Sequence, residues 1–186
     1  MSLNFVFSKE NDKIVQDTIK KYPEDKRFSA IMPALTSAQK QNGGFLTDEV
    51  IKYVADYLQV SNIAVAEVAN FYSMYNLKPV GKYLIQTCNS VVCCMKGSDE
   101  LHNYAKEITG TISQDVSSDG LFSVKKVECL GACSNAIAIK INDTFVEDVT
   151  KENLFQQIEE LKAGKPLIEK FNIRKTLIED KIEENG

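Results

Sequence analysis

Hydrophobic residues in the first part of the chain recur every three to four positions, and alternation with period two is almost absent there. The pattern predicts amphipathic helices over residues 11–22, 27–44, 47–60 and 61–75. Pro23 should end the first helix because proline cannot continue one, and Pro33 should kink the second. Thr47 and Ser61 stand at N-cap positions, and Gly43 follows the second helix as a stop. Helices joined by short loops predict a small bundle.

After Pro79 the pattern changes to a mixture of strand-like alternation and helical spacing. Strands are predicted over residues 82–88, 121–129, 135–143 and 143–149, and helices over residues 97–110 and 150–164. We therefore predict an α+β fold with a helical domain at residues 1–78, a mixed α/β domain at 79–165 and a charged tail at 166–186. The tail is weakly patterned and is expected to be disordered or to fold only on a partner.

The composition is that of a soluble globular protein, since 44% of the residues are hydrophobic and 26% are charged. No apolar run approaches the ~20 residues that cross a bilayer, so we expect no insertion into a membrane. The N-terminal sequence lacks the features of a secretory signal or a transit peptide, which predicts a cytoplasmic location. A net charge of -4 argues against binding nucleic acid, which needs a clustered basic face.

Four of the five cysteines form two close pairs, Cys88 with Cys93 and Cys129 with Cys133. Thiolates are soft ligands that suit clustered iron or zinc rather than Mg2+ or Ca2+. Each pair begins at the end of a predicted strand, so adjacent strands would bring the two loops together. Gly131 would let the second loop turn tightly and point an N–H at a sulfur. The pattern predicts four thiolate ligands for one iron–sulfur cluster.

Other interpretations of the cysteines are weaker. Structural zinc is the main chemical rival, although its cysteine pairs commonly belong to more compact modules. A thiol–disulfide enzyme would be expected to show C-x-x-C, which is absent, and the cytosol disfavours structural disulfides. Packing in a core would explain one or two cysteines but not two loop pairs. A Rieske centre needs two histidines, and the chain has only His102, which is expected at a helix surface or in packing.

Three stretches carry a family resemblance: "CNSVVC", "SSDGLFSVKKVECLGAC" and "FVEDVTKENLFQQIEELKAGKP". They resemble the thioredoxin-like [2Fe-2S] subunits of NADH:quinone oxidoreductase, respiratory complex I, in which this component is often called the E subunit. The resemblance continues into the helical part through "AQKQNGGFL" and "VANFYSMYNLKPVG", so it covers about residues 15–165.

The resemblance implies that the α/β domain is a thioredoxin-like ferredoxin and that Cys88, Cys93, Cys129 and Cys133 ligate one [2Fe-2S] cluster. It implies that the helical half packs against a flavin- and NADH-binding subunit, and that electrons exchange with FMN reduced by NADH. Such a chain would belong to the peripheral arm, at the cytoplasmic face of the bacterial inner membrane. The small subunits of soluble NAD-dependent hydrogenases and formate dehydrogenases share the motif and form the alternative assignment.

Two positions depart from the family pattern: Ile137 stands where proline is common, and Ser117 replaces threonine. Because no P-loop or GxGxxG appears, we expect no catalytic residues and no NADH oxidation by the isolated chain. The remaining thiol, Cys94, adjoins Cys93, and the C-x4-C spacing and the resemblance favour Cys93 as the ligand. We expect Cys94 to be a buried small hydrophobe. A C-x5-C pair or a reactive thiol at Cys94 are the alternatives.

Overall fold

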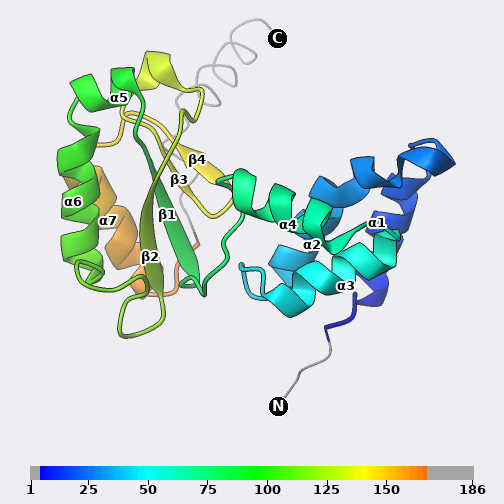
Figure 1. Cartoon of the computed structure of the whole chain (residues 1–186). Coiled ribbons are helices and arrows are strands. Elements are labelled where there is room, and N and C mark those ends of the chain that lie inside the picture. The colour runs from blue at the N-terminus through cyan, green and yellow to red at the C-terminus, as the bar shows by residue number, and fades with distance from the viewer. Residues whose placement is uncertain (1–4, 167–186) are drawn as a thin grey trace, which may run out of the picture. The chain divides into compact units, whose positions relative to one another are not determined.

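The computed structural model describes residues 5–166, so nearly all of the predicted C-terminal tail lies outside the described residues. The chain divides between Val80 and Gly81 into two compact units. The first unit is helical and the second combines helices with a sheet (Figure 1). The predicted α+β fold class is therefore confirmed.

The helical unit contains α1 (Lys9–Ile19), the 3-10 helix η1 (Glu24–Ala30), α2 (Ile31–Gln41), α3 (Asp48–Leu58) and α4 (Asn62–Phe71). The predicted N-caps are confirmed, because the side chain of Thr47 accepts from the N–H of Val50 and that of Ser61 accepts from the N–H of Ala64. Such caps satisfy backbone donors that have no partner within the helix.

The second predicted helix, residues 27–44, is wrong at its start. Its first residues belong to η1, and the α-helix α2 begins only at Ile31. Pro33 therefore lies in the first turn of α2 instead of in the interior of a longer helix. Backbone N–H groups in a first turn have no intrahelical acceptor, so proline costs no hydrogen bond there and the expected kink is not needed.

Aliphatic side chains from all four α-helices form the core of the helical unit. Val15, Leu35, Val54, Leu58 and Val65 are each at most 1% exposed. They repeat along the helices at the spacing that puts one stripe of each helix inside. Burying this stripe is what holds the bundle together, since short helices are marginal in water on their own.

Within the described residues, the second unit contains four strands, two of which pair in parallel, and four α- or 3-10 helices. Its elements are β1 (Tyr83–Cys88), α5 (Val91–Met95), α6 (Ser98–Thr109), β2 (Phe122–Val127), η2 (Cys133–Asn135), β3 (Ile139–Ile141), β4 (Thr144–Val146) and α7 (Lys151–Lys162). The strand order is β2-β1-β3-β4, with β1 and β2 parallel and the other pairs antiparallel. The last two strands, β3 and β4, form a hairpin.

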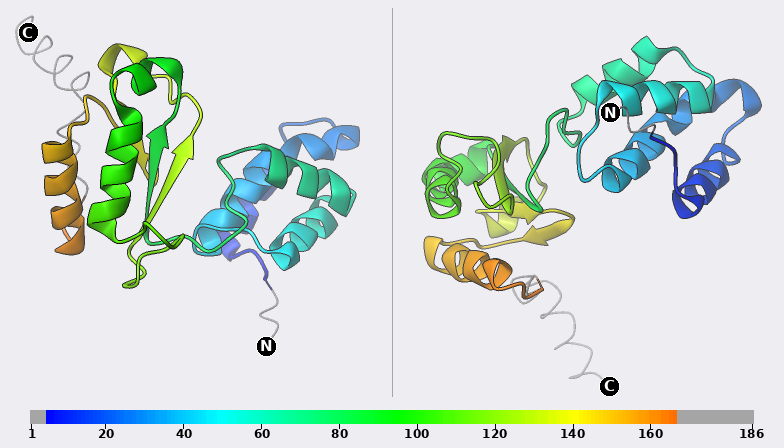
Figure 2. Two further views of the ribbon diagram at one scale, coloured as in Figure 1. Left: turned by 60° about the vertical axis from the view of Figure 1, so that its left-hand side comes forward. Right: turned by 90° about the horizontal axis from the view of Figure 1, so that it is seen from below.

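Helices α6 and α7 cover the same face of this sheet (Figures 1 and 2). Ile85 in β1, Phe122 in β2 and Ile139 in β3 point into the space beneath them and are fully buried. Leu101 from α6 and Leu154 from α7 complete this core. The register aligns Tyr83 with Phe122 at one end of the parallel pair and Cys88 with Val127 at the other. The segments after Cys88 and Val127 therefore leave the same edge of the sheet.

Candidate metal centre

The sulfur site lies where the chain leaves the carboxyl ends of β1 and β2. Cys88 is the last residue of β1, and after two intervening residues the chain enters α5, which contains Cys93. Cys129 follows β2 by two residues, and Cys133 begins η2. The parallel pairing brings these two loops together, as the sequence predicted. Helix α5 was missed, because five residues are too few to show a helical period.

The two thiol pairs differ in their exposure to solvent. Cys88 and Cys93 are 3% and 2% exposed and belong to an apolar cluster with three alanines, Ala132, Ala136 and Ala138. Cys129 and Cys133 are exposed. The site therefore has a buried inner pair, Cys88 and Cys93, and an exposed outer pair, Cys129 and Cys133.

The outer pair has the spacing of two ligands on one metal. The Sγ atoms of Cys129 and Cys133 are 3.8 Å apart. A tetrahedral metal with metal–sulfur bonds of ~2.3 Å holds two of its sulfurs ~3.8 Å apart. Within residues 5–166, no group of three or more His, Cys, Asp or Glu side chains is arranged to hold a metal ion. A [2Fe-2S] cluster takes its protein ligands as two on each iron, and paired soft thiolates fit that requirement.

Gly131 shapes the outer loop as expected from the sequence. Its φ of 79° lies in the left-handed region that glycine adopts without strain. Its N–H donates to the Sγ of Cys129 at 3.4 Å. This backbone hydrogen bond and then the Cys133 thiol hold the pKa of Cys129 below its ordinary value. The pKa of Cys133 is raised by the neighbouring Cys129, so Cys129 is the first of the outer pair to lose its proton.

Cys93 of the inner pair has a different electrostatic setting from Cys129. Burial is the largest cause that raises the pKa of Cys93, and the neighbouring Cys88 raises it further. A thiolate at this position is disfavoured until a positive partner such as a metal compensates for the lost solvation. Metal binding at Cys93 is therefore coupled to the loss of its proton.

Cys94 lies in different surroundings from Cys93. Its sulfur donates to Asn89 Oδ1 and accepts from Ser98 Oγ, each at 3.6 Å. It is half-buried, so the expectation of a fully buried small hydrophobe is wrong. The polar neighbours on both sides explain the difference, because a sulfur that makes hydrogen bonds has no need of an apolar enclosure.

His102 is buried, although the sequence left it at a surface or in packing. It is 9% exposed, and its Nδ1 lies 2.8 Å from the Oγ1 of Thr87, the residue before Cys88. Burial lowers its pKa from the ordinary value, and the charge of Lys126 acts in the same direction. The sequence carried no signal for this contact, since fifteen positions separate the two residues.

The departure at Ile137 lies in the segment between Cys133 and β3. The peptide bond between Ala136 and Ile137 is cis. Ile137 also packs against the apolar cluster that surrounds the inner thiols. The other departure, Ser117, accepts from the N–H of Phe122 at the start of β2.

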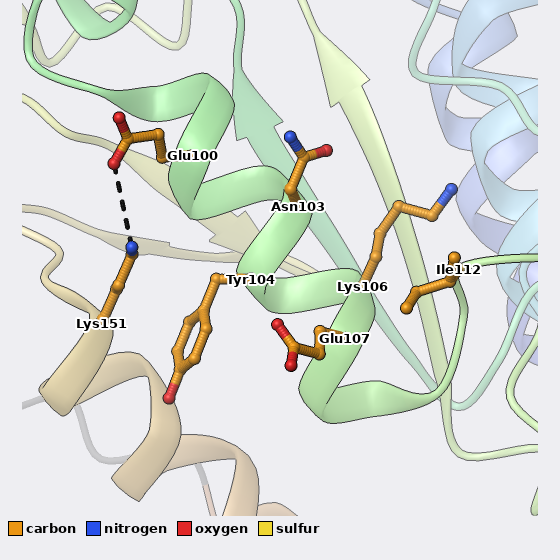
Figure 3. A pocket seen from close by; sticks show the side chains of 7 residues that line it. All are labelled: Glu100, Asn103, Tyr104, Lys106, Glu107, Ile112 and Lys151. Carbon is orange, nitrogen blue, oxygen red and sulfur yellow. Dashed lines mark ion pairs between the residues drawn. The ribbon is translucent and has the colours of Figure 1, made fainter.

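Away from the thiols, a hollow lies between α6 and the start of α7 (Figure 3). Lys151 pairs with Glu100 at 3.8 Å across it and lies over the ring of Tyr104. Lys106 and Glu107 add one more charge of each sign to the lining. Because the lining charges are mixed, this groove selects neither anions nor cations. The thiols remain the candidate functional site.

The four-stranded sheet, its two covering helices and the paired thiols at one edge define a ferredoxin of the thioredoxin-like class. The chain belongs to the thioredoxin-like [2Fe-2S] ferredoxin family, whose sequence pattern matches residues 15–162. The predicted family is therefore confirmed. The assignment of individual ligands stays a prediction.

Relatives with the same sequence pattern are components of NADH-quinone oxidoreductase. The chain is 45% identical over 159 residues to the E subunit of that enzyme from Rickettsia bellii, covering 86% of this chain and 95% of the relative. It is 44% identical over 160 residues to the protein of the same name in Rickettsia felis, covering 86% and 96%.

A solved structure shares the fold. The NAD+-reducing [NiFe]-hydrogenase in its H2-reduced state superposes with a TM-score of 0.60 at 19% identity. The match covers 71% of this chain and 22% of that chain. At this identity the likeness concerns the fold alone. In the part of the chain that the structure describes, no helix has the length and apolar character needed to cross a membrane.

Proposed function

We propose that the chain is an electron-transfer subunit of NADH:quinone oxidoreductase and that Cys88, Cys93, Cys129 and Cys133 hold one [2Fe-2S] cluster. The observation that carries the proposal is the meeting of two thiol pairs at one edge of a thioredoxin-like sheet. The relatives that are E subunits support the particular complex, since their identity of 39–45% extends over most of this chain.

Each thiol pair serves one iron in this arrangement. Cys129 and Cys133 would hold one iron, and the N–H of Gly131 would stabilise the negative charge on the Cys129 sulfur. Cys88 and Cys93 would hold the other iron, and the alanines around them limit the access of water. A [2Fe-2S] cluster supplies one-electron transfer, with potentials in the region of ~-400 mV for plant-type clusters.

The electron donor of this subunit is a flavoprotein partner that carries FMN and binds NADH. The sequence has neither a P-loop nor a GxGxxG motif, so the chain itself offers no recognisable dinucleotide site. The helical unit provides a surface for such a partner. Phe71 at the end of α4 is 80% exposed, and Ile63 on the same helix is also exposed. Large apolar side chains left in water are typical of surfaces that a partner covers.

The second candidate is the small subunit of a soluble NAD-dependent hydrogenase or formate dehydrogenase. The fold shared with the NAD+-reducing hydrogenase favours it. The chain is only 19% identical to that hydrogenase but 45% identical to an E subunit, and this difference favours the respiratory complex. Copurification separates the two, because tagging this chain should recover quinone-reducing subunits in one case and hydrogenase or formate dehydrogenase subunits in the other.

The test of cluster binding is anaerobic purification followed by iron, zinc and sulfide analysis and low-temperature EPR. We expect iron and acid-labile sulfide in equal amounts and the EPR signal of a reduced [2Fe-2S] cluster. Zinc without acid-labile sulfide in the native chain would instead support a zinc-stabilised module and would overturn the proposal.

The test of the partner is NADH oxidation with ferricyanide as the electron acceptor. We expect no turnover by the pure, flavin-free chain and turnover when the flavoprotein partner is added. Robust activity of the chain alone would contradict the assignment of NADH and FMN to the partner.

A further inference from the structure

The inner and outer thiol pairs differ greatly in their exposure to solvent. The sulfurs of Cys129 and Cys133 belong to exposed residues, whereas Cys88 and Cys93 are at most 3% exposed. A cluster that arrives from another molecule must be approached by a protein thiol while the donor still holds it. Only the outer pair is placed for that first contact.

We propose that Cys129 and Cys133 are the entry side of the site: they take a [2Fe-2S] cluster from a thiolate-ligated donor, and Cys88 and Cys93 bind second. The proposal rests on the proposed function and adds the order of ligand exchange to it. The reaction that supplies this subunit is then cluster transfer from a carrier that holds the cluster through thiolates at its own surface.

The geometry of the outer pair suits the binding of one iron. Its sulfurs are 3.8 Å apart, which is the separation that one tetrahedral iron requires. The left-handed turn at Gly131 sets the loop, and the N–H of Gly131 already points at the Cys129 sulfur. A pair with this spacing and this turn loses little conformational entropy on binding an iron.

Both residues of the inner pair belong to regular secondary structure, Cys88 to β1 and Cys93 to α5. The backbone at Cys88 is tied into the sheet, because the N–H of Cys88 donates to Ala138 and the N–H of Asn89 donates to Val127. Cys93 is carried by α5, a five-residue helix that ends before Gly97. Because Cys88 and Cys93 are almost fully buried, their binding follows the first contact.

Helix α5 also presents apolar side chains beside the entry. Val91 and Met95 are 71% and 84% exposed. They are placed to contact the donor during transfer, in addition to the thiols themselves.

The exchange balances without an oxidant or a reductant. At each step an iron–sulfur bond to a cysteine of this chain forms and an iron–sulfur bond to the donor breaks. The proton of the incoming thiol passes to the released donor thiolate, directly or through water. The irons and the bridging sulfides keep their oxidation states throughout.

The test uses the metal-free full chain and a [2Fe-2S] complex ligated by four glutathione thiolates, mixed without oxygen. Native mass spectrometry identifies the species, and visible circular dichroism follows transfer with time. The double variant Cys88→Ser/Cys93→Ser should accumulate the chain with a [2Fe-2S] cluster that still carries two glutathione ligands. The variant Cys129→Ser/Cys133→Ser should lose that species, and the wild type should proceed to a cluster without glutathione.

Two controls keep the result interpretable. Cys94→Ala removes a thiol that lies beside the inner pair and should transfer like the wild type. Serine preserves the size of cysteine, so each serine variant is expected to fold. Far-ultraviolet circular dichroism checks this.

The opposite pattern would overturn the proposal: a mixed species on Cys129→Ser/Cys133→Ser, or none on Cys88→Ser/Cys93→Ser. A wild type that assembles a cluster from iron and sulfide but not from the glutathione complex would overturn ligand exchange alone. A wild type that forms no cluster by either route would overturn the proposed function as well. The two failures are therefore distinguishable.

Discussion

The helical unit and the α/β unit are stabilised in the same way but carry different chemistry. Each buries a stripe of aliphatic side chains, and each uses hydroxyl caps at helix N-termini, such as Ser61 in the first unit and Thr150 in the second. All five cysteines lie in the α/β unit. The helical unit has no cysteine, and it exposes large apolar side chains on α4, including Phe71.

In this protein the parallel strand pair, and not the helical bundle, brings together the loops that carry the cysteines. Because β1 and β2 run in the same direction, two loops that are distant in sequence leave one edge together. That edge can gather ligands from both loops, and the remainder of the unit only has to hold the strands in place. We therefore expect redox chemistry to depend on the α/β unit and association with partners to draw on the helical unit.

The largest expected effect is the loss of the cluster on changing a single ligand. Serine in place of Cys88, Cys93, Cys129 or Cys133 opens a coordination position and exposes iron to solvent, so each variant should lose or distort the [2Fe-2S] cluster. Iron and sulfide analysis with EPR measures the effect. A variant at one of the four positions with full cluster content and an unchanged spectrum would remove that residue from the ligand set.

The same substitution in each of the two cores should separate the stability of the helical unit from that of the α/β unit. Leu58→Ala in α3 and Leu154→Ala in α7 each remove a fully buried side chain, which should cost ~2–5 kcal/mol in the free energy of unfolding. Only Leu154→Ala should release the cluster at lower urea, because Leu154 belongs to the core beneath the sheet.

Urea titrations read by far-ultraviolet and visible circular dichroism follow helices and cluster separately. If Leu58→Ala released the cluster as early as Leu154→Ala does, the two units would unfold as one and the comparison between them would fail.

A smaller effect is expected from pH through His102. Its pKa in the folded chain is lowered by burial, then by Lys126 and Lys106, while Asp99 opposes the shift. The unfolded chain therefore binds a proton at higher pH than the folded chain does. The stability that comes from neutral His102 is present above pH ~6.5 and is lost as the pH falls through the lower, folded value.

The variant His102→Gln has no such group and keeps an amide that can bond Thr87. Its free energy of unfolding, measured by urea titration from pH ~7 to ~5, should fall less steeply than that of the wild type. Equal slopes in the two proteins would show that His102 does not titrate in this range.

The smallest effect is expected at Cys94. Its sulfur bonds Asn89 and Ser98, so Cys94→Ala should leave the iron content and the EPR spectrum essentially intact. Cys93→Ala is the matched change one position away and should deplete the cluster. The reverse pattern would assign the ligand to Cys94 and favour C-x5-C spacing.

Local sequence signals predicted much of the secondary structure. The caps at Thr47, Ser61 and Thr150 depend on a hydroxyl and the few residues after it, so they can be recognised without knowing the fold. The start of α2 was missed because Pro33 is compatible with either a kink or a first turn. Helix α5 was missed because it is shorter than the window in which a period can be recognised.

The four candidate ligands could be predicted from the sequence alone. Four cysteines in two pairs, each after a predicted strand, indicate soft-metal chemistry whatever fold the remaining residues adopt. Only the tertiary structure decided how those thiols differ. Cys88 and Cys93 are buried among Ala132, Ala136 and Ala138, which lie between β2 and β3 and are distant from them in sequence. Burial is a property of packing among distant segments, and a spacing along the chain cannot record it.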